Sequence, residues 1–169
     1  MKKILLSLAI SMLSVHAQSY ADKPLVAKKI YTIDYDKNAT GLVRHLKLIK
    51  DPKWVAKIET RGGKVVYFSS PKSMFEFYFR PGKWFDVGVK SERDFSQIVV
   101  TDYLTGKAID GESAYYIYGS RATSPAGDDL VAIGDRDRAE KFSQGYNGKR
   151  VLRFDEVSDA LIRLLNGRI

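Results

Sequence analysis

The sequence contains no cysteine among its 169 residues. Disulfide bonds, thiolate metal sites and thiol nucleophiles are therefore excluded, as is lipid attachment through an N-terminal cysteine. Other soft donors are few, because beyond residue 21 the sequence holds one methionine, Met74, and one histidine, His45. The G-x-S-x-G, Gly-Lys phosphate-loop and H-E-x-x-H motifs of common enzyme classes are also missing. We therefore expect a protein that is not an enzyme.

The sequence has no apolar run long enough to cross a bilayer, which requires about 20 residues. A short apolar run at residues 4–13 follows Lys2 and Lys3 and precedes small-residue cleavage patterns that end at Ala17 and Ala21. This order is typical of an export signal. We expect residues 1–21 to be a signal peptide, and the mature protein to be periplasmic and not lipid-anchored. The alternative is an uncleaved N-terminal anchor.

The charge is basic, with 28 Lys and Arg against 20 Asp and Glu, a net charge of +8. Removal of residues 1–21, which carry Lys2 and Lys3, leaves 26 against 20, or +6. A basic balance can indicate nucleic-acid binding. Here the charges are spread along the chain and export would separate it from nucleic acid, so we expect no such ligand. An acidic partner, or peripheral contact with an anionic membrane, remains open.

Two stretches of the sequence predict the same order of elements, strand, strand, helix, strand. In the first, a helix begins at Ser70, whose hydroxyl can cap it, with Pro71 at its first position. In the second, Asp137 with Glu140 resembles a capping box, and residues 119–129 form an expected linker. The predicted strands are 54–58, 64–68 and 95–103, then 114–118, 130–133 and 150–154.

A unit of this size buries little surface alone, so two such units should share a core. We predict an α+β fold of two pseudo-repeated ββαβ units with small antiparallel sheets, at residues 51–105 and 106–169. The second ends in a helix from Ser158 with Leu161, Leu164 and Leu165 on its apolar face. The alternative is one continuous sheet with both helices on one face.

The segment at residues 22–50 is a polar N-terminal extension. Residues 30–33 indicate a short strand, and the apolar residues of 42–49 have helical spacing. His45 lies among the latter. No function follows from this pattern alone.

Met74 and His45 are the candidate metal ligands, since Cu(I) prefers thiolate, thioether and imidazole donors. Met74 adjoins Phe75 at helical spacing, where a methionine is more often a core side chain than a metal ligand. The paired acids Asp128 and Asp129 are expected at the surface or at a helix cap.

Five runs of the sequence occur in a characteristic order: D-P-K-W-V-A-K-I (51–58), G-K-V-V-Y-F-S-S-P-K-S-M-F-E-F-Y (63–78), V-V-T-D-Y (99–103), A-Y-Y-I-Y-G-S (114–120) and G-K-R-V-L-R-F-D-E-V (148–157). Together they resemble the NosL family, the accessory proteins of nitrous oxide reductase. The resemblance implies two ββαβ units like those of the organomercurial-lyase-related fold. It also implies an extracytoplasmic Cu(I) chaperone whose partner is a periplasmic copper enzyme or its assembly factors.

The departures from the family lie at its copper ligands. Family members usually begin with a lipid-bearing cysteine, which is missing here. The family's G-P-M-G linker, whose methionine is a copper ligand, is matched by Ser124-Pro125-Ala126-Gly127. We therefore predict an exported accessory protein that assists copper delivery to, or assembly of, nitrous oxide reductase. The alternative is a metal-free periplasmic interaction protein that kept the fold, and the oligomeric state is left open.

Overall fold

The structure is a computed structural model that describes residues 29–168. The predicted signal peptide lies outside the described residues. Within the described part, no helix has both the length and the apolar character needed to cross a membrane.

The first sheet has four antiparallel strands in the order β2-β1-β3-β4. Helix α1 follows β2, and its start confirms the prediction, because the Ser70 side chain accepts a hydrogen bond from the Ser73 backbone and Pro71 holds the first position. Strand β4 was not predicted, and the expected boundary after Thr105 falls inside the β3–β4 hairpin. The elements are β1 (Ala56–Thr60), β2 (Val65–Phe68), α1 (Pro71–Phe79), β3 (Phe95–Thr101) and β4 (Ala108–Asp110).

The second sheet has three antiparallel strands in the order β6-β5-β7. Helix α2 lies between β6 and β7 in sequence, and α3 follows β7. The elements are β5 (Tyr115–Ser124), β6 (Gly127–Ile133), α2 (Arg136–Gly145), β7 (Arg150–Arg153) and α3 (Asp159–Leu165).

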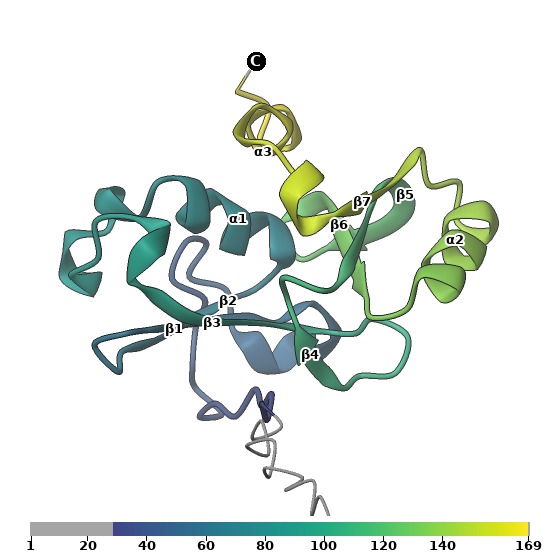
Figure 1. Ribbon diagram of the computed structural model, residues 1–169. Coiled ribbons are helices and arrows are strands. Elements are labelled where there is room, and N and C mark those ends of the chain that lie inside the picture. The colour runs from purple at the N-terminus through teal and green to yellow at the C-terminus, as the bar shows by residue number, and fades with distance from the viewer. Residues whose placement is uncertain (1–28, 169) are drawn as a thin grey trace, which may run out of the picture.

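The two halves repeat one topology, which confirms the predicted fold class. In each, the first strand lies between the second and the third, and a helix links the second to the third. The first sheet adds β4 at the edge of β3. Figure 1 shows α1 on one face of the first sheet, the second sheet beside α1, and α2 on the far side of the second sheet.

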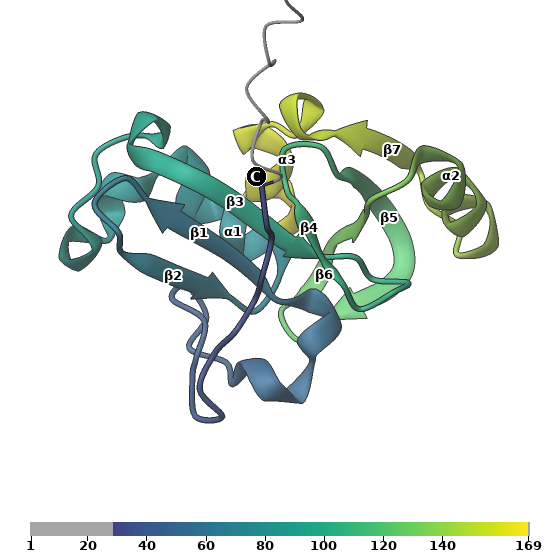
Figure 2. The ribbon, with the colours of Figure 1, turned by 60° about the horizontal axis from the view of Figure 1, so that its bottom comes forward.

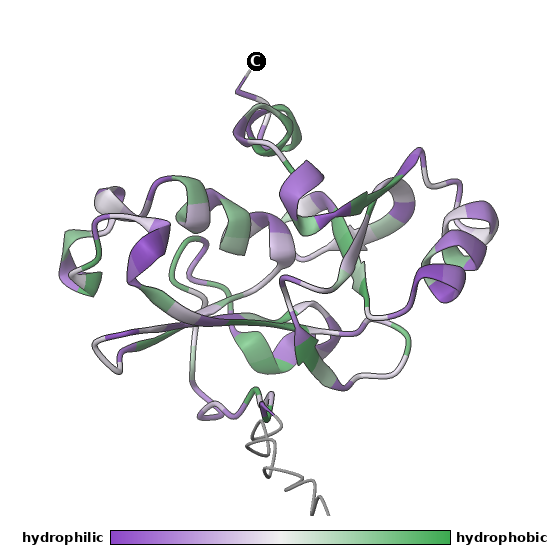
Figure 3. Cartoon of the chain, viewed as in Figure 1, coloured by the Kyte–Doolittle hydropathy of each residue, from purple (hydrophilic) through white to green (hydrophobic). Residues whose placement is uncertain are grey.

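The core is shared between the halves. Strand residues of the second sheet alternate between two apolar clusters, as the pleat of a strand requires. One face of this sheet packs with α1 and the first sheet, through Tyr116, Leu130, Ala132 and Leu152. The other face packs with Trp54 and α2, through Ile117, Val131 and Ile133. Helix α2 is largely hydrophilic, as Figure 3 shows, and buries Ala139 and Phe142.

Three local predictions were wrong in detail. The expected linker at 119–129 is a β-hairpin, because β5 runs to Ser124 and β6 begins at Gly127. Helix α2 is capped by Asp135, whose side chain accepts from the Arg138 backbone, rather than by Asp137. On α3 the buried residue is Ile162, whereas Leu164 is 48% exposed.

Residues 29–50, the described part of the N-terminal extension, form neither the short strand nor the α-helix expected of them, and their one helical turn is a 3-10 turn at Leu48–Lys50. Residues 29–35 are irregular and cross the face of the first sheet opposite α1, as Figure 2 shows. The Tyr67 hydroxyl donates to the Asp34 carbonyl, and the Gln97 amide donates to the Ile30 carbonyl at 3.3 Å. Side chains of the sheet therefore hold this segment.

Asp102 joins the two halves. It is 1% exposed, and its Oδ2 accepts from the Gly134 N–H of the second half at 2.8 Å. Its Oδ1 accepts from the Leu104 and Thr105 N–H groups at 3.0 and 2.9 Å. Burial opposes ionisation of Asp102, but these hydrogen bonds outweigh it, so its pKa lies below the usual 3.8.

We expect Asp102→Asn to lower the free energy of unfolding by about 2 kcal/mol at pH 7, because it removes a charged acceptor from buried N–H groups. A depressed pKa in the folded state adds stability above the unfolded pKa, and this stability is lost as pH falls through the folded pKa. The difference between wild type and Asp102→Asn should therefore shrink in acid. Urea unfolding at pH 7 and pH 3 measures it, and a constant difference would refute this role.

Candidate functional site

A pocket of ≈ 410 Å³, the hairpin pocket, lies at the tip of the β5–β6 hairpin. Four segments meet there: the loop at residues 40–47, the first turn of α1, the hairpin tip and the end of α3. The hairpin tip holds residues 124–127, which the resemblance described above matches to the ligand-bearing linker of the family. The lining residues are Arg44, Leu46, Lys72, Pro125, Ala126, Leu165 and Asn166.

The loop at residues 40–47 is held in place by its own backbone and by β2. Thr40 and Lys47 form an isolated β-bridge, and the Leu42 N–H donates to the Tyr67 carbonyl at 2.8 Å. Gly41 packs so closely that a Cβ there would lie 2.7 Å from the Ser69 backbone nitrogen. The loop is thereby pressed against the residues that cap α1, which brings Arg44 to the pocket.

Lys72 forms the buried wall of the pocket, with 2% of its surface exposed. Its Nζ donates to the Ala126 carbonyl at 2.9 Å and to the Leu165 carbonyl at 3.3 Å. Burial lowers the pKa of Lys72, and repulsion from Arg44 acts in the same direction against attraction to Asp129. An ammonium group therefore stands directly against the hairpin tip.

Asp129 anchors the hairpin to α1. It is 3% exposed, so the expectation of a surface carboxylate was wrong for it, although it does cap a helix. Its Oδ1 accepts from the Lys72 N–H at 2.7 Å and from the Leu130 N–H at 2.8 Å, and its Oδ2 from the Ser124 hydroxyl at 2.7 Å. Burial raises the pKa of Asp129, and these hydrogen bonds offset part of the rise.

Glu76 accepts hydrogen bonds from the remaining polar groups behind the pocket. It is 5% exposed and lies one turn after Lys72 on the same face of α1. Its carboxylate accepts from Arg44 at 3.1 Å, from Asn166 at 2.9 Å and from Arg168 at 2.7 Å. The end of α3 and the loop before β1 are thereby tied to α1.

The predicted ligands Met74 and His45 occupy different environments. Met74 is fully buried in the shared core, and it follows Lys72 by two residues, about 200° around the helix axis. Its thioether is therefore turned away from the hairpin pocket. His45 is exposed and lies in the loop between two pocket residues, with φ at 54°, in the left-handed region. Whether either residue binds a metal stays a prediction.

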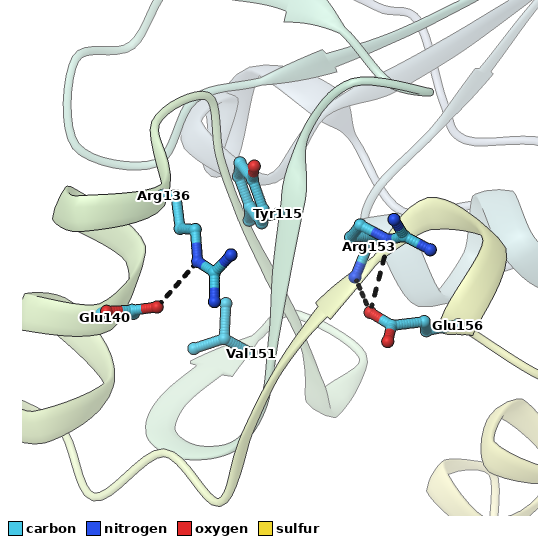
Figure 4. Close-up of a pocket in the computed structure, with 6 residues that line it drawn as sticks. All are labelled: Tyr115, Arg136, Glu140, Val151, Arg153 and Glu156. Carbon is cyan, nitrogen blue, oxygen red and sulfur yellow. Dashed lines mark hydrogen bonds and ion pairs between the residues drawn. The ribbon is translucent and has the colours of Figure 1, made fainter.

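A second groove, of ≈ 400 Å³, lies between α2 and β7. Figure 4 shows Tyr115 and Val151 in it, with two arginines that each face a carboxylate. Arg136 donates to Glu140 at 2.9 Å. Arg153 pairs with Asp155 at 2.8 Å and, at 3.9 Å, with Glu156. The positive charges of this groove are thus neutralised within its own walls.

The donor set of the hairpin pocket does not suit a soft metal ion. Its described lining residues offer amide, ammonium and guanidinium groups and no thiolate, thioether or imidazole. Residues 29–168 also contain no group of three His, Cys, Asp or Glu that could hold a metal. Instead, the pocket presents hydrogen-bond donors and positive charge. The sequence did not mark Lys72, Arg44 and Asn166, because nothing local shows that they meet.

Comparisons with known proteins agree with this fold. A family model described as NosL matches residues 32–162. The "Copper-binding lipoprotein NosL" of Stutzerimonas stutzeri is 29% identical over 106 residues, 63% of this chain and 54% of that protein. The chain thus spans about half the length of this curated relative. The crystal structure of the copper chaperone NosL from Shewanella denitrificans superposes with a TM-score of 0.66, at 20% identity, over 78% of this chain and 99% of that one.

Proposed function

Because the chain belongs to the NosL family, we propose that it is an exported accessory protein that assists the copper assembly of nitrous oxide reductase. The observation that carries the proposal is the family match across both ββαβ halves, from residue 32 to residue 162. Two similar proteins, one described as copper-binding and one as a copper chaperone, support it. A periplasmic location follows from the export signal expected at residues 1–21.

Copper is the cargo in this proposal, and this chain supplies few ligands for it. His45 is exposed beside the hairpin pocket, and its left-handed backbone is a conformation that costs a non-glycine residue about 1–2 kcal/mol. Strained backbone of this kind is found preferentially at functional positions. We assign His45 as the imidazole donor and the partner as the source of the remaining donors. Met74 stays in the core.

A second candidate function is a metal-free interaction protein of the same assembly. The buried ammonium of Lys72 favours it, because Nζ lies 2.9 Å from the Ala126 carbonyl, where the family carries its methionine ligand. A positive charge there repels a Cu(I) ion. Under this alternative, the protein binds a component of the assembly without touching the metal.

Anaerobic Cu(I) titration against a competing chelator, followed by transfer to apo-reductase, tests the proposal. We expect the protein alone to bind Cu(I) more weakly than about micromolar. We also expect it to increase the copper loaded into the reductase. His45→Ala should abolish the increase, and Met74→Leu, which keeps the core filled, should not.

The outcomes separate the candidates. An increase that survives in His45→Ala would favour the metal-free function. No increase with any variant would refute an accessory role in copper assembly.

A further inference from the structure

The hairpin pocket differs from the groove of Figure 4 in its charge balance. The two have nearly equal volumes, ≈ 410 and ≈ 400 Å³. In the groove, Arg136 and Arg153 each pair with a carboxylate that also lines it or adjoins it. The described residues lining the hairpin pocket include Arg44 and Lys72 but no carboxylate. Its wall therefore carries positive charge that no acidic side chain of the wall neutralises.

The hairpin pocket also has more donors than acceptors. An ammonium has three N–H donors, and two of those on Lys72 are taken by carbonyls. The Arg44 guanidinium uses one nitrogen, Nη2, for both Glu76 and Asn166. Its Nε is buried and has no partner within residues 29–168. An acceptor entering the pocket would therefore meet the third N–H of Lys72 and the other terminal nitrogen of the Arg44 guanidinium, whereas the Nε is closed off by burial.

The charges outside the wall balance its positive charge in number but do not line it. Arg44, Lys72 and Arg168 give three positive charges, and Glu76, Asp128 and Asp129 give three negative ones. None of these three carboxylates lines the hairpin pocket. Glu76 already accepts from both arginines, and Asp129 from backbone N–H groups and a serine. Burial lowers the pKa of Lys72, and attraction to Asp129, Asp128 and Glu76 opposes this shift.

We propose that the hairpin pocket binds a single carboxylate group of a partner polypeptide. This inference rests on the proposed function, because the partner is a component of the assembly that the protein serves. The Lys72 ammonium and the Arg44 guanidinium hold the carboxylate, and the Asn166 amide borders it. At the position aligned with the family's copper ligand, this chain thus receives an anionic side chain or chain end.

The surroundings favour a polypeptide over a small free anion. Leu46 and Pro125 line the pocket beside the charged groups. Leu165 also lines an adjoining hollow together with Leu164, which is 48% exposed, and with the charged residues Asp128, Asp129 and Lys149. The apolar side chains beside the charged centre suit a peptide whose acidic residue is flanked by apolar ones. Inorganic phosphate would use the charged centre alone.

Fluorescence anisotropy tests the proposal with a labelled peptide that has a central glutamate, flanking leucines and an amidated C-terminus. We expect it to bind the full protein at least about tenfold more tightly than the matched glutamine peptide, the effect of one charge-assisted hydrogen bond. Lys72→Met and Arg44→Gln should each reduce binding about tenfold. Arg136→Gln, in the groove of Figure 4, is the matched control and should change nothing. A free-carboxylate glutamine peptide distinguishes a chain end from a side chain.

Three results would overturn the proposal. The first is that wild type binds the two amidated peptides equally and gains no affinity from the free C-terminal carboxylate. The second is that Arg136→Gln loses as much peptide affinity as the pocket variants. The third is that inorganic phosphate displaces the peptide when it is present at the same concentration as the peptide. Arg44 is partly exposed, so Arg44→Gln should fold and keeps the test decisive if Lys72→Met does not. Copper transfer to apo-reductase is measured separately, so failure of peptide binding would leave the accessory function standing.

Discussion

Replacing Phe75 with alanine is expected to lower the free energy of unfolding by about 4 kcal/mol, the usual cost of a large cavity in a core. Phe75 is fully buried on α1. Its ring lies 5.0 Å from Tyr116 and 5.0 Å from Phe154, both in the second half, and 6.0 Å from Phe79 in the first. The loss should therefore weaken both halves together.

Denaturant unfolding followed by circular dichroism and tryptophan fluorescence measures this. Trp54 lies in the cluster under α2, and Trp84 packs on Phe77 at 5.5 Å in the other cluster. In Phe75→Ala, the unfolding midpoint measured by circular dichroism and the midpoint measured by tryptophan fluorescence should fall by the same amount. The control Leu164→Ala, at a residue 48% exposed, should cost less than about 0.5 kcal/mol. Separate transitions for the two tryptophans would show that the halves do not share one core.

Replacing Asp129 with alanine is expected to cost about 3 kcal/mol, because it leaves buried donors without an acceptor. These donors are the Lys72 and Leu130 N–H groups and the Ser124 hydroxyl. The hairpin would lose its attachment to α1. Asp128→Asn, at the exposed neighbour, is the control and should have little effect.

The pH dependence of Asp129 should run opposite to that of Asp102. Burial raises the pKa of Asp129 above the usual 3.8, so the folded state binds the proton more tightly than the unfolded state. Its contribution is fully present below the unfolded pKa and is lost as pH rises through the folded pKa. In wild type, the contribution of Asp129 to the free energy of unfolding should decline from about pH 4 upward, and Asp129→Asn should remove this decline. An equal decline in the stability of wild type and Asp129→Asn would contradict this assignment to Asp129.

The repeated topology could be predicted because its signals are local. Alternating apolar residues indicated the strands, and Ser70 with Pro71 marked the start of α1. The β5–β6 hairpin was mistaken for a linker because Gly119, with φ at 74°, and the polar residues after it interrupt the strand pattern. Strand β4 has three residues, too few for a periodic signal.

The hairpin pocket could not be predicted, because its wall joins residues far apart in sequence. Lys72 reaches the carbonyls of Ala126 and Leu165, 54 and 93 residues away. Arg44 contacts Glu76, 32 residues on. From the sequence alone, a lysine in the first turn of a helix is expected to lie at the surface. Only the packing of α3 and the hairpin over α1 buries it.

The amide spectrum of ¹⁵N-labelled protein tests most directly whether the hairpin pocket receives a carboxylate instead of Cu(I). The protein would be titrated with Cu(I) under anaerobic conditions and, in a separate sample, with the amidated glutamate peptide. We predict that the signals of Ala126 and the Asn166 side chain move with the peptide and stay unchanged with Cu(I). Movement of these signals with stoichiometric Cu(I), and none with the peptide, would contradict this account.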